Sequence, residues 1–133
     1  MAPYALVVDD DFLIRMEAMD ILEQAGFQVL DAEDAATALE LLKTRHPEIS
    51  LLFTDVQMPG ELDGFALARR VAASWPHISI VVASGHVKPG PGMMPDKARF
   101  VGKPFSAAVV HAHLQEILPG SKKPEPLRHS AVP

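Results

Sequence analysis

The stretch Ile78-Ser79-Ile80-Val81-Val82-Ala83 decides the fold class, because it is apolar almost throughout and does not alternate between polar and apolar residues. A strand of this kind is typical of a parallel sheet that is covered on both faces. Four further candidate strands lie at Tyr4–Val8, Gln28–Asp31, Ile49–Thr54 and Arg99–Gly102. The sequence therefore predicts five strands in a single sheet.

Amphipathic stretches separate these strands, and their apolar residues recur with a helical period. We predict helices over Phe12–Ala25, from an Asp34 cap to about His46, from about Phe65 to before Pro76, and from a Ser106 cap onward. In the first helix, the stripe of Phe12, Met16 and Met19 is predicted to belong to the core. Alternating strands and helices indicate a three-layer α/β domain over residues 1–118, followed by a disordered tail over 119–133.

The segment between the fourth and fifth strands departs from this alternation. Six of the eleven residues from Gly85 to Pro95 are glycine or proline. Each glycine costs a helix about 1 kcal/mol and each proline about 3 kcal/mol. We therefore expect the fourth helix to be short or replaced by a loop, with at most one turn around Pro95–Ala98.

Composition limits the possible partners and compartments. The 133 residues carry a net charge of −5. Lys122, Lys123, Arg128 and Glu125 account for +2 of it, which leaves −7 for residues 1–118 and disfavours nucleic acid as a partner. No apolar run is long enough to span a membrane, and the start does not match a secretory signal, so we expect a cytoplasmic protein. The absence of cysteine leaves oxygen or imidazole as metal ligands.

Chemically active side chains follow the predicted strands at the edge where their carboxyl ends meet. They are Asp9, Asp10 and Asp11 after the first strand, Asp55 after the third, Ser84 after the fourth and Lys103 after the fifth. Each alone is commonly a cap, a turn residue or a solvated side chain. Together they place several carboxylates in one pocket, where they repel unless a cation or a proton intervenes. We therefore expect Mg²⁺, with Asp55 as a nucleophile toward a phosphoryl group.

Four stretches, in this order, resemble the receiver domain of bacterial two-component response regulators. They are Leu6-Val7-Val8-Asp9-Asp10-Asp11, the run from Phe53 to Gly64 (FTDVQMPGELDG), Val82-Ala83-Ser84-Gly85-His86, and Phe100-Val101-Gly102-Lys103-Pro104-Phe105. The resemblance covers about residues 4–118. It implies a flavodoxin-like, doubly wound sheet of five parallel strands in the order 2-1-3-4-5.

The resemblance also implies a role for each matching residue. Asp55 is the expected phosphoacceptor. The expected Mg²⁺ ligands are Asp10, Asp55 and the backbone carbonyl of Gln57, with Asp9 behind them. Lys103 and Ser84 are expected to contact the phosphoryl group, and Ser84 and Phe100 are the expected switch residues. The phosphoryl donor would be a sensor histidine kinase or a histidine phosphotransfer protein. Such a domain catalyses its own phosphorylation and dephosphorylation and is not a conventional turnover enzyme.

Three other classes of protein share either the fold or the phosphoryl chemistry expected of a receiver domain. A flavin-binding electron carrier would need a phosphate loop rich in Ser, Thr or Gly where this chain has Asp9-Asp10-Asp11-Phe12. A haloacid-dehalogenase-like phosphatase would need Thr or Val where position 13 is Leu. A receiver-like interaction module that is never phosphorylated usually lacks one of the pocket residues. We expect a stand-alone receiver, or one excised from a hybrid kinase, that is a monomer or weak dimer.

Overall fold

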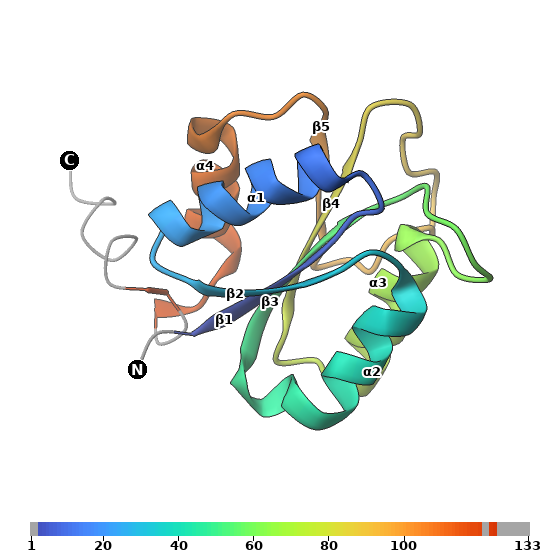
Figure 1. The fold of residues 1–133 in the computed structure, drawn as a ribbon, viewed down its shortest axis with the longest axis horizontal. Helices are drawn as coiled ribbons and strands as arrows, with labels where there is room; N and C mark the ends of the chain where they lie inside the picture. Colours follow the sequence, from blue (N-terminus) through green and yellow to red (C-terminus); the bar gives the residue numbers. More distant parts are fainter. Residues whose placement is uncertain (1–2, 121–122, 125–133) are drawn as a thin grey trace.

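The computed structural model describes residues 3–120 and 123–124, which form a parallel five-stranded sheet with helices on both faces (Figure 1). The strand order is β2-β1-β3-β4-β5, which confirms the predicted doubly wound topology. The strands are β1 (Tyr4–Val8), β2 (Gln28–Ala32), β3 (Ile49–Asp55), β4 (Ser79–Ser84) and β5 (Arg99–Gly102). The helices are α1 (Phe12–Gln24), α2 (Ala35–Arg45), the short 3-10 helix η1 (His46–Glu48), α3 (Gly64–Ser74) and α4 (Ala107–Ile117).

The central strands supply a core on each side of the sheet. On β1, Ala5 and Val7 join the core beneath α1 and α4, whereas Leu6 and Val8 join the core beneath α2 and α3. All four side chains are completely buried. Figure 1 shows these two helix pairs on opposite faces of the sheet. Strands buried on both faces need apolar residues at successive positions, which explains why polar alternation is absent from the sequence.

Side chains at the carboxyl edge of the sheet begin the helices. The carboxylate of Asp11 accepts hydrogen bonds from the amides of Leu13 and Ile14 at the start of α1. Asp34, Asp63 and Ser106 cap α2, α3 and α4 in the same way. A cap of this kind stabilises a helix by about 1 kcal/mol. Asp11 is therefore committed to a structural role, unlike the two aspartates before it.

A loop replaces the helix expected between β4 and β5. Residues 85–98, all within the described part of the chain, contain no helix, which confirms the prediction from their glycines and prolines. The amide of Ala98 donates to the carbonyl of Pro95 at 3.0 Å, forming the turn predicted around Pro95–Ala98, and the amide of Met93 donates to the carbonyl of Gly90 at 3.1 Å in a second turn. Val87, Met93 and Met94 pack against the core on the α2 and α3 side. The loop thus covers part of the sheet with its own apolar side chains.

The prediction that Phe12 and Met16 belong to the core is wrong. Their side chains are 60% and 49% exposed, and only Met19 of the predicted stripe packs partly against the core. The helical period explains the error, because Ala18, Ile21 and Leu22 turn toward the sheet and place positions 12 and 16 on the opposite side of α1. An apolar patch is therefore exposed on α1.

Two expectations about the ends and the environment of the chain have different outcomes. The disordered tail predicted over 119–133 falls largely outside the described residues, and the domain boundary at residue 118 stays a prediction. None of the helices in the described part of the chain has the length and the apolar run needed to cross a bilayer.

Candidate functional site

Four strands bring their carboxyl ends to one pocket of about 610 Å³. Asp9 follows β1, Asp55 ends β3, Ser84 ends β4 and Lys103 follows β5. All four line the pocket, as the sequence predicted from their positions after the strands. The remaining lining residues include Asp10, Ile14, Glu17, Gln57, His86 and Phe105.

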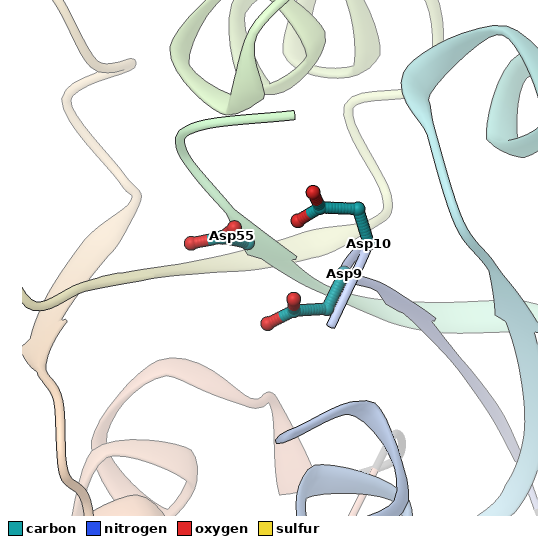
Figure 2. A group of neighbouring side chains, drawn as sticks. All are labelled: Asp9, Asp10 and Asp55. Carbon is teal, nitrogen blue, oxygen red and sulfur yellow. The ribbon is translucent and has the colours of Figure 1, made fainter. Parts of the chain in front are cut away.

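Three carboxylates converge in this pocket. Asp9, Asp10 and Asp55 each place one oxygen within 4.8 Å of the other two, and Figure 2 shows Asp55 on β3 beside the pair that follows β1. Asp9 and Asp55 are buried, whereas Asp10 is exposed. A group of oxygen ligands with one solvent-facing member is suited to a hard divalent cation that keeps some of its water.

Lys103 joins two of these carboxylates. Its Nζ lies 2.8 Å from Oδ1 of Asp55 and 3.1 Å from Oδ2 of Asp9. Burial lowers the pKa of Lys103, but the hydrogen bonds to Asp55 and Asp9 outweigh that effect and raise the pKa above its usual value. The ammonium therefore stays charged at neutral pH and offsets part of the negative charge in the pocket.

Asp9 is the carboxyl group whose ionisation the protein opposes. Its removal from water is the largest influence and raises its pKa, and the charge of Asp55 raises it further. The hydrogen bond from the Asp11 amide, 2.9 Å long, and the contact with Lys103 offset only part of this increase. The pocket is thus an electrostatically unfavourable arrangement that added positive charge relieves.

Ser84 connects the pocket to the loop that follows β4. Its Oγ accepts hydrogen bonds from the amides of His86 at 3.3 Å and Val87 at 3.1 Å. The carbonyl of Ser84 accepts the amide of Lys103 at 3.0 Å, which fixes β5 beside β4 at this edge. A rotation of the Ser84 side chain that moves Oγ would therefore break the hydrogen bonds that this atom accepts and disturb the start of the loop.

The two remaining predicted residues lie at different distances from the pocket. Gln57 is exposed and lines it. Phe100 lies on β5 opposite Val82 of β4 and packs partly against the core on the α2 and α3 side. Phe100 packs against the same core as Val87, Met93 and Met94 of the loop, and it is not among the residues that line the pocket.

Gly64 has a structural role at the site that the sequence analysis overlooked. Its amide donates to the carbonyl of Val56 at 2.8 Å, and a Cβ atom at this position would lie 1.8 Å from the carbonyl oxygen of Asp55. No side chain fits in that space. The available signal was a glycine immediately after the Asp63 cap, a position where other residues favour a helix more strongly.

Arg15 is a second residue that sequence reasoning missed. Only the apolar residues of this helix were considered in the sequence analysis. In the structure its Nη1 donates to the carbonyl of Asp9 at 2.7 Å, and its Nε donates to Oδ2 of Asp31 at 3.0 Å. A helical pattern cannot reveal this contact, because Asp31 lies on a different element.

The fold and the site together define a class: a doubly wound α/β protein with an acidic pocket at the carboxyl edge of its parallel sheet. A family model for the response regulator receiver domain matches residues 5–115. The chain therefore belongs to the receiver domain family of two-component response regulators.

Individual proteins agree with this assignment. Transcriptional regulatory protein CseB of Streptomyces avermitilis is 33% identical over 117 residues, which cover 86% of this chain and 48% of CseB. Response regulator receiver protein CpdR of Brucella abortus is 36% identical over 105 residues, covering 75% of this chain and 83% of CpdR. The receiver domain of a signal transduction histidine kinase from Syntrophus aciditrophicus superposes with a TM-score of 0.76 at 26% identity, covering 93% of this chain and 96% of that one.

The length of these relatives limits what is carried over to this chain. The chain spans about half of the length of CseB, although it spans most of CpdR. The transcriptional role in the name of CseB is therefore not assigned to this chain.

Proposed function

We propose that this receiver accepts a phosphoryl group on Asp55, with Mg²⁺ in the acidic pocket, from a histidine of a sensor kinase or phosphotransfer protein. One observation carries the proposal: Lys103 holds Oδ1 of Asp55 at 2.8 Å in a pocket that two further carboxylates share. Such a pocket combines a nucleophile, a fixed cation and ligands for a second cation. These are the components that phosphoryl transfer requires.

The donor set fits Mg²⁺. The ligands are all oxygen atoms, and a single ammonium opposes three converging carboxylates. We assign Asp10, Asp55 and the backbone carbonyl of Gln57 as ligands, with Asp9 supporting them from behind. When bound, the ion would neutralise the charge that the pocket and an incoming phosphate share.

Different residues of the chain would then have different roles in the transfer of the phosphoryl group. An oxygen of the Asp55 carboxylate attacks phosphorus, the bond from phosphorus to the donor histidine nitrogen breaks, and that nitrogen keeps the electron pair. Lys103 would hold the carboxylate and the transferred group in position through its charge. The acidic lining, including exposed Asp10, keeps other anions out of the pocket unless their charge is neutralised.

Ser84 would couple phosphorylation of Asp55 to the conformation of the loop at the protein surface. Its hydroxyl can donate to a phosphoryl oxygen, but turning toward Asp55 weakens the hydrogen bonds that Oγ accepts from His86 and Val87. The loop then loses the contact that fixes its first residues, and Phe100, which packs against the same core as the loop, can repack. Phosphorylation would thereby shift the population between two arrangements of this surface.

The exposed part of α1 supports a protein partner as the phosphoryl donor. Phe12, Leu13 and Met16 are 60%, 75% and 49% exposed, and the neighbouring Ile14 and Glu17 line the pocket. An apolar surface at the mouth of an acidic pocket is suited to a helical partner that presents a phosphorylated histidine. The related Syntrophus aciditrophicus chain comes from a histidine kinase.

The test uses a small acyl phosphate as donor, with intact mass as the readout. We expect one added phosphoryl group in Mg²⁺ and almost none in chelator. Asp55→Asn should remain unmodified, whereas Glu61→Gln, a change in the loop after β3 but outside the pocket lining, should behave as the wild type. Modification of Asp55→Asn at the wild-type rate would overturn the assignment, and no modification under any condition would favour an interaction module that is never phosphorylated.

A further inference from the structure

The side chain of Arg15 connects three elements beside the acidic pocket. It leaves α1 and is only 13% exposed, although arginine side chains are mostly exposed in proteins. Its Nη1 donates to the carbonyl of Asp9 at 2.7 Å, and its Nε donates to Asp31 on β2 at 3.0 Å. Arg15 therefore ties α1 to the end of β1 and to the end of β2.

The carbonyl that Arg15 contacts belongs to the peptide unit between Asp9 and Asp10. On the other side of Asp9, the backbone amide donates to the carbonyl of Ala32 at 3.1 Å. The backbone of Asp9 is thus held at both its amide and its carbonyl. The orientation of the second peptide unit determines the direction in which the Asp10 side chain leaves the chain.

Asp10 is the carboxylate that most needs such support. Asp9 and Asp55 are buried and share the ammonium of Lys103, so their positions are fixed by packing and by charge. Asp10 is exposed, yet its carboxylate lies within 4.8 Å of the other two. A flexible Asp10 would lose rotational freedom whenever it bound a cation, and this loss would weaken binding.

We propose that Arg15 is a positioning residue of the metal site: it holds the Asp9–Asp10 peptide so that the Asp10 carboxylate stays directed toward Asp9 and Asp55. Asp31 in turn fixes the guanidinium. The inference rests on the proposed Mg²⁺-dependent phosphorylation and adds a residue that touches neither the ion nor the phosphoryl group. Groups that orient metal ligands typically contribute about 10-fold to 100-fold in metal affinity.

The shape of the guanidinium is important for this role. Arg15 uses two different nitrogens, one for the carbonyl and one for the carboxylate. A lysine has a single ammonium on a flexible stem and cannot reproduce this fixed fork. Arg15→Lys should therefore retain part of the effect, and Arg15→Ala should retain none of it.

The test is a calorimetric titration of the full chain with Mg²⁺ alone. We expect Arg15→Ala to bind about tenfold more weakly than the wild type. Arg15→Lys and Asp31→Ala should lie between the two proteins. The matched control is Arg45→Ala, which also breaks an arginine pair with a carboxylate, at Glu48, but away from the pocket, and it should bind as the wild type does.

A kinetic measurement separates positioning from a general loss of structure. With a small acyl phosphate as donor, the Mg²⁺ concentration that gives half the maximal phosphorylation rate should rise about tenfold in Arg15→Ala. The rate at saturating Mg²⁺ should stay close to that of the wild type. A lower maximal rate with an unchanged half-saturating concentration would contradict the proposal.

The possible failures are distinguishable. If the wild type binds Mg²⁺ and is phosphorylated but Arg15→Ala and Asp31→Ala bind Mg²⁺ equally well, the role of Arg15 is wrong and the proposed function stands. If the wild type neither binds Mg²⁺ nor accepts phosphate, the proposed function itself fails. If Arg15→Ala does not fold, Asp31→Ala decides the result, because it leaves the guanidinium in place without its second partner.

Discussion

Asp9 and Lys103 are 94 residues apart in the chain, yet their side chains form a hydrogen bond of 3.1 Å. This contact could be anticipated, because each residue follows a strand and parallel strands bring their carboxyl ends together. Arg15 and Gly64 could not be anticipated in the same way. Their roles depend on the backbone carbonyl groups of Asp9 and Asp55. The sequence of side chains does not indicate where a backbone carbonyl points, so these contacts could not be predicted from it.

The raised pKa of Asp9 leads to a prediction about stability. A carboxyl group whose pKa is higher in the folded protein than in the unfolded chain favours folding at pH values below its unfolded value of 3.8. That contribution is lost as the pH rises through the folded value. In metal-free buffer at neutral pH, Asp9→Asn should therefore have a higher Tm than the wild type, and the difference should vanish as the pH falls below the unfolded value of 3.8.

Asp34→Asn is a control for which the expected change in Tm has the opposite sign. The pKa of Asp34 is lowered by hydrogen bonds from Thr37, so its contribution to stability is present above the unfolded pKa and is lost on acidification. Its Tm should lie slightly below that of the wild type at neutral pH. An Asp9→Asn protein that melts below the wild type at neutral pH would show that the pocket stabilises the ionised carboxylate.

At the scale of the elements, local composition predicted the strands and the loop better than it predicted the faces of α1. The Gly and Pro residues of 85–95 exclude a helix whatever packs against them, because the cost is intrinsic to the backbone. By contrast, the three methionine and phenylalanine residues of α1 are compatible with either face. Only the position of the sheet decides which face is buried.

Arg69 leads to a prediction about the loop between β4 and β5. Its Nη1 donates to the carbonyl of Met93 at 2.7 Å and connects the loop to α3. Because the pair is exposed, we expect Arg69→Ala to reduce the local opening free energy by about 1 kcal/mol, so that amide exchange over residues 87–97 becomes about fivefold faster. Hydrogen exchange with mass spectrometry measures this change.

The neighbouring Arg70→Ala is the matched control for this experiment. Arg70 is an exposed residue of the same helix, so the two variants change helix propensity and charge equally. Exchange in the loop should be unchanged in Arg70→Ala. Equal acceleration in both variants would show that the loop responds to charge on α3 and not to the contact with Met93.

At the scale of the whole molecule, the loop affects how a signal would leave the domain. Residues 85–98 contain no helix, and Val87, Met93 and Met94 of this loop pack against the core on the α2 and α3 side. A loop of this composition offers no regular helical surface for pairing with a second copy. We therefore predict that the domain stays monomeric when the phosphoryl group is mimicked by beryllium fluoride with Mg²⁺, and that exchange slows in residues 85–98.

Light scattering and hydrogen exchange together test this prediction. We expect the molar mass to stay that of one chain with and without beryllium fluoride. We expect slower amide exchange only in the loop and around the pocket. Dimers that form only with beryllium fluoride and that disappear on substitution of exposed α4 residues such as Val109 would contradict it.

The most direct test of the central proposal locates the phosphoryl group itself. After incubation with a small acyl phosphate and Mg²⁺, borohydride reduction converts an aspartyl phosphate to homoserine, and peptide mass spectrometry then identifies the converted residue. We predict conversion at Asp55 alone, and its loss when Mg²⁺ is chelated. Conversion at Asp9 or Asp10 in the wild type, or undiminished conversion at Asp55 in chelator, would contradict the roles proposed for the three carboxylates.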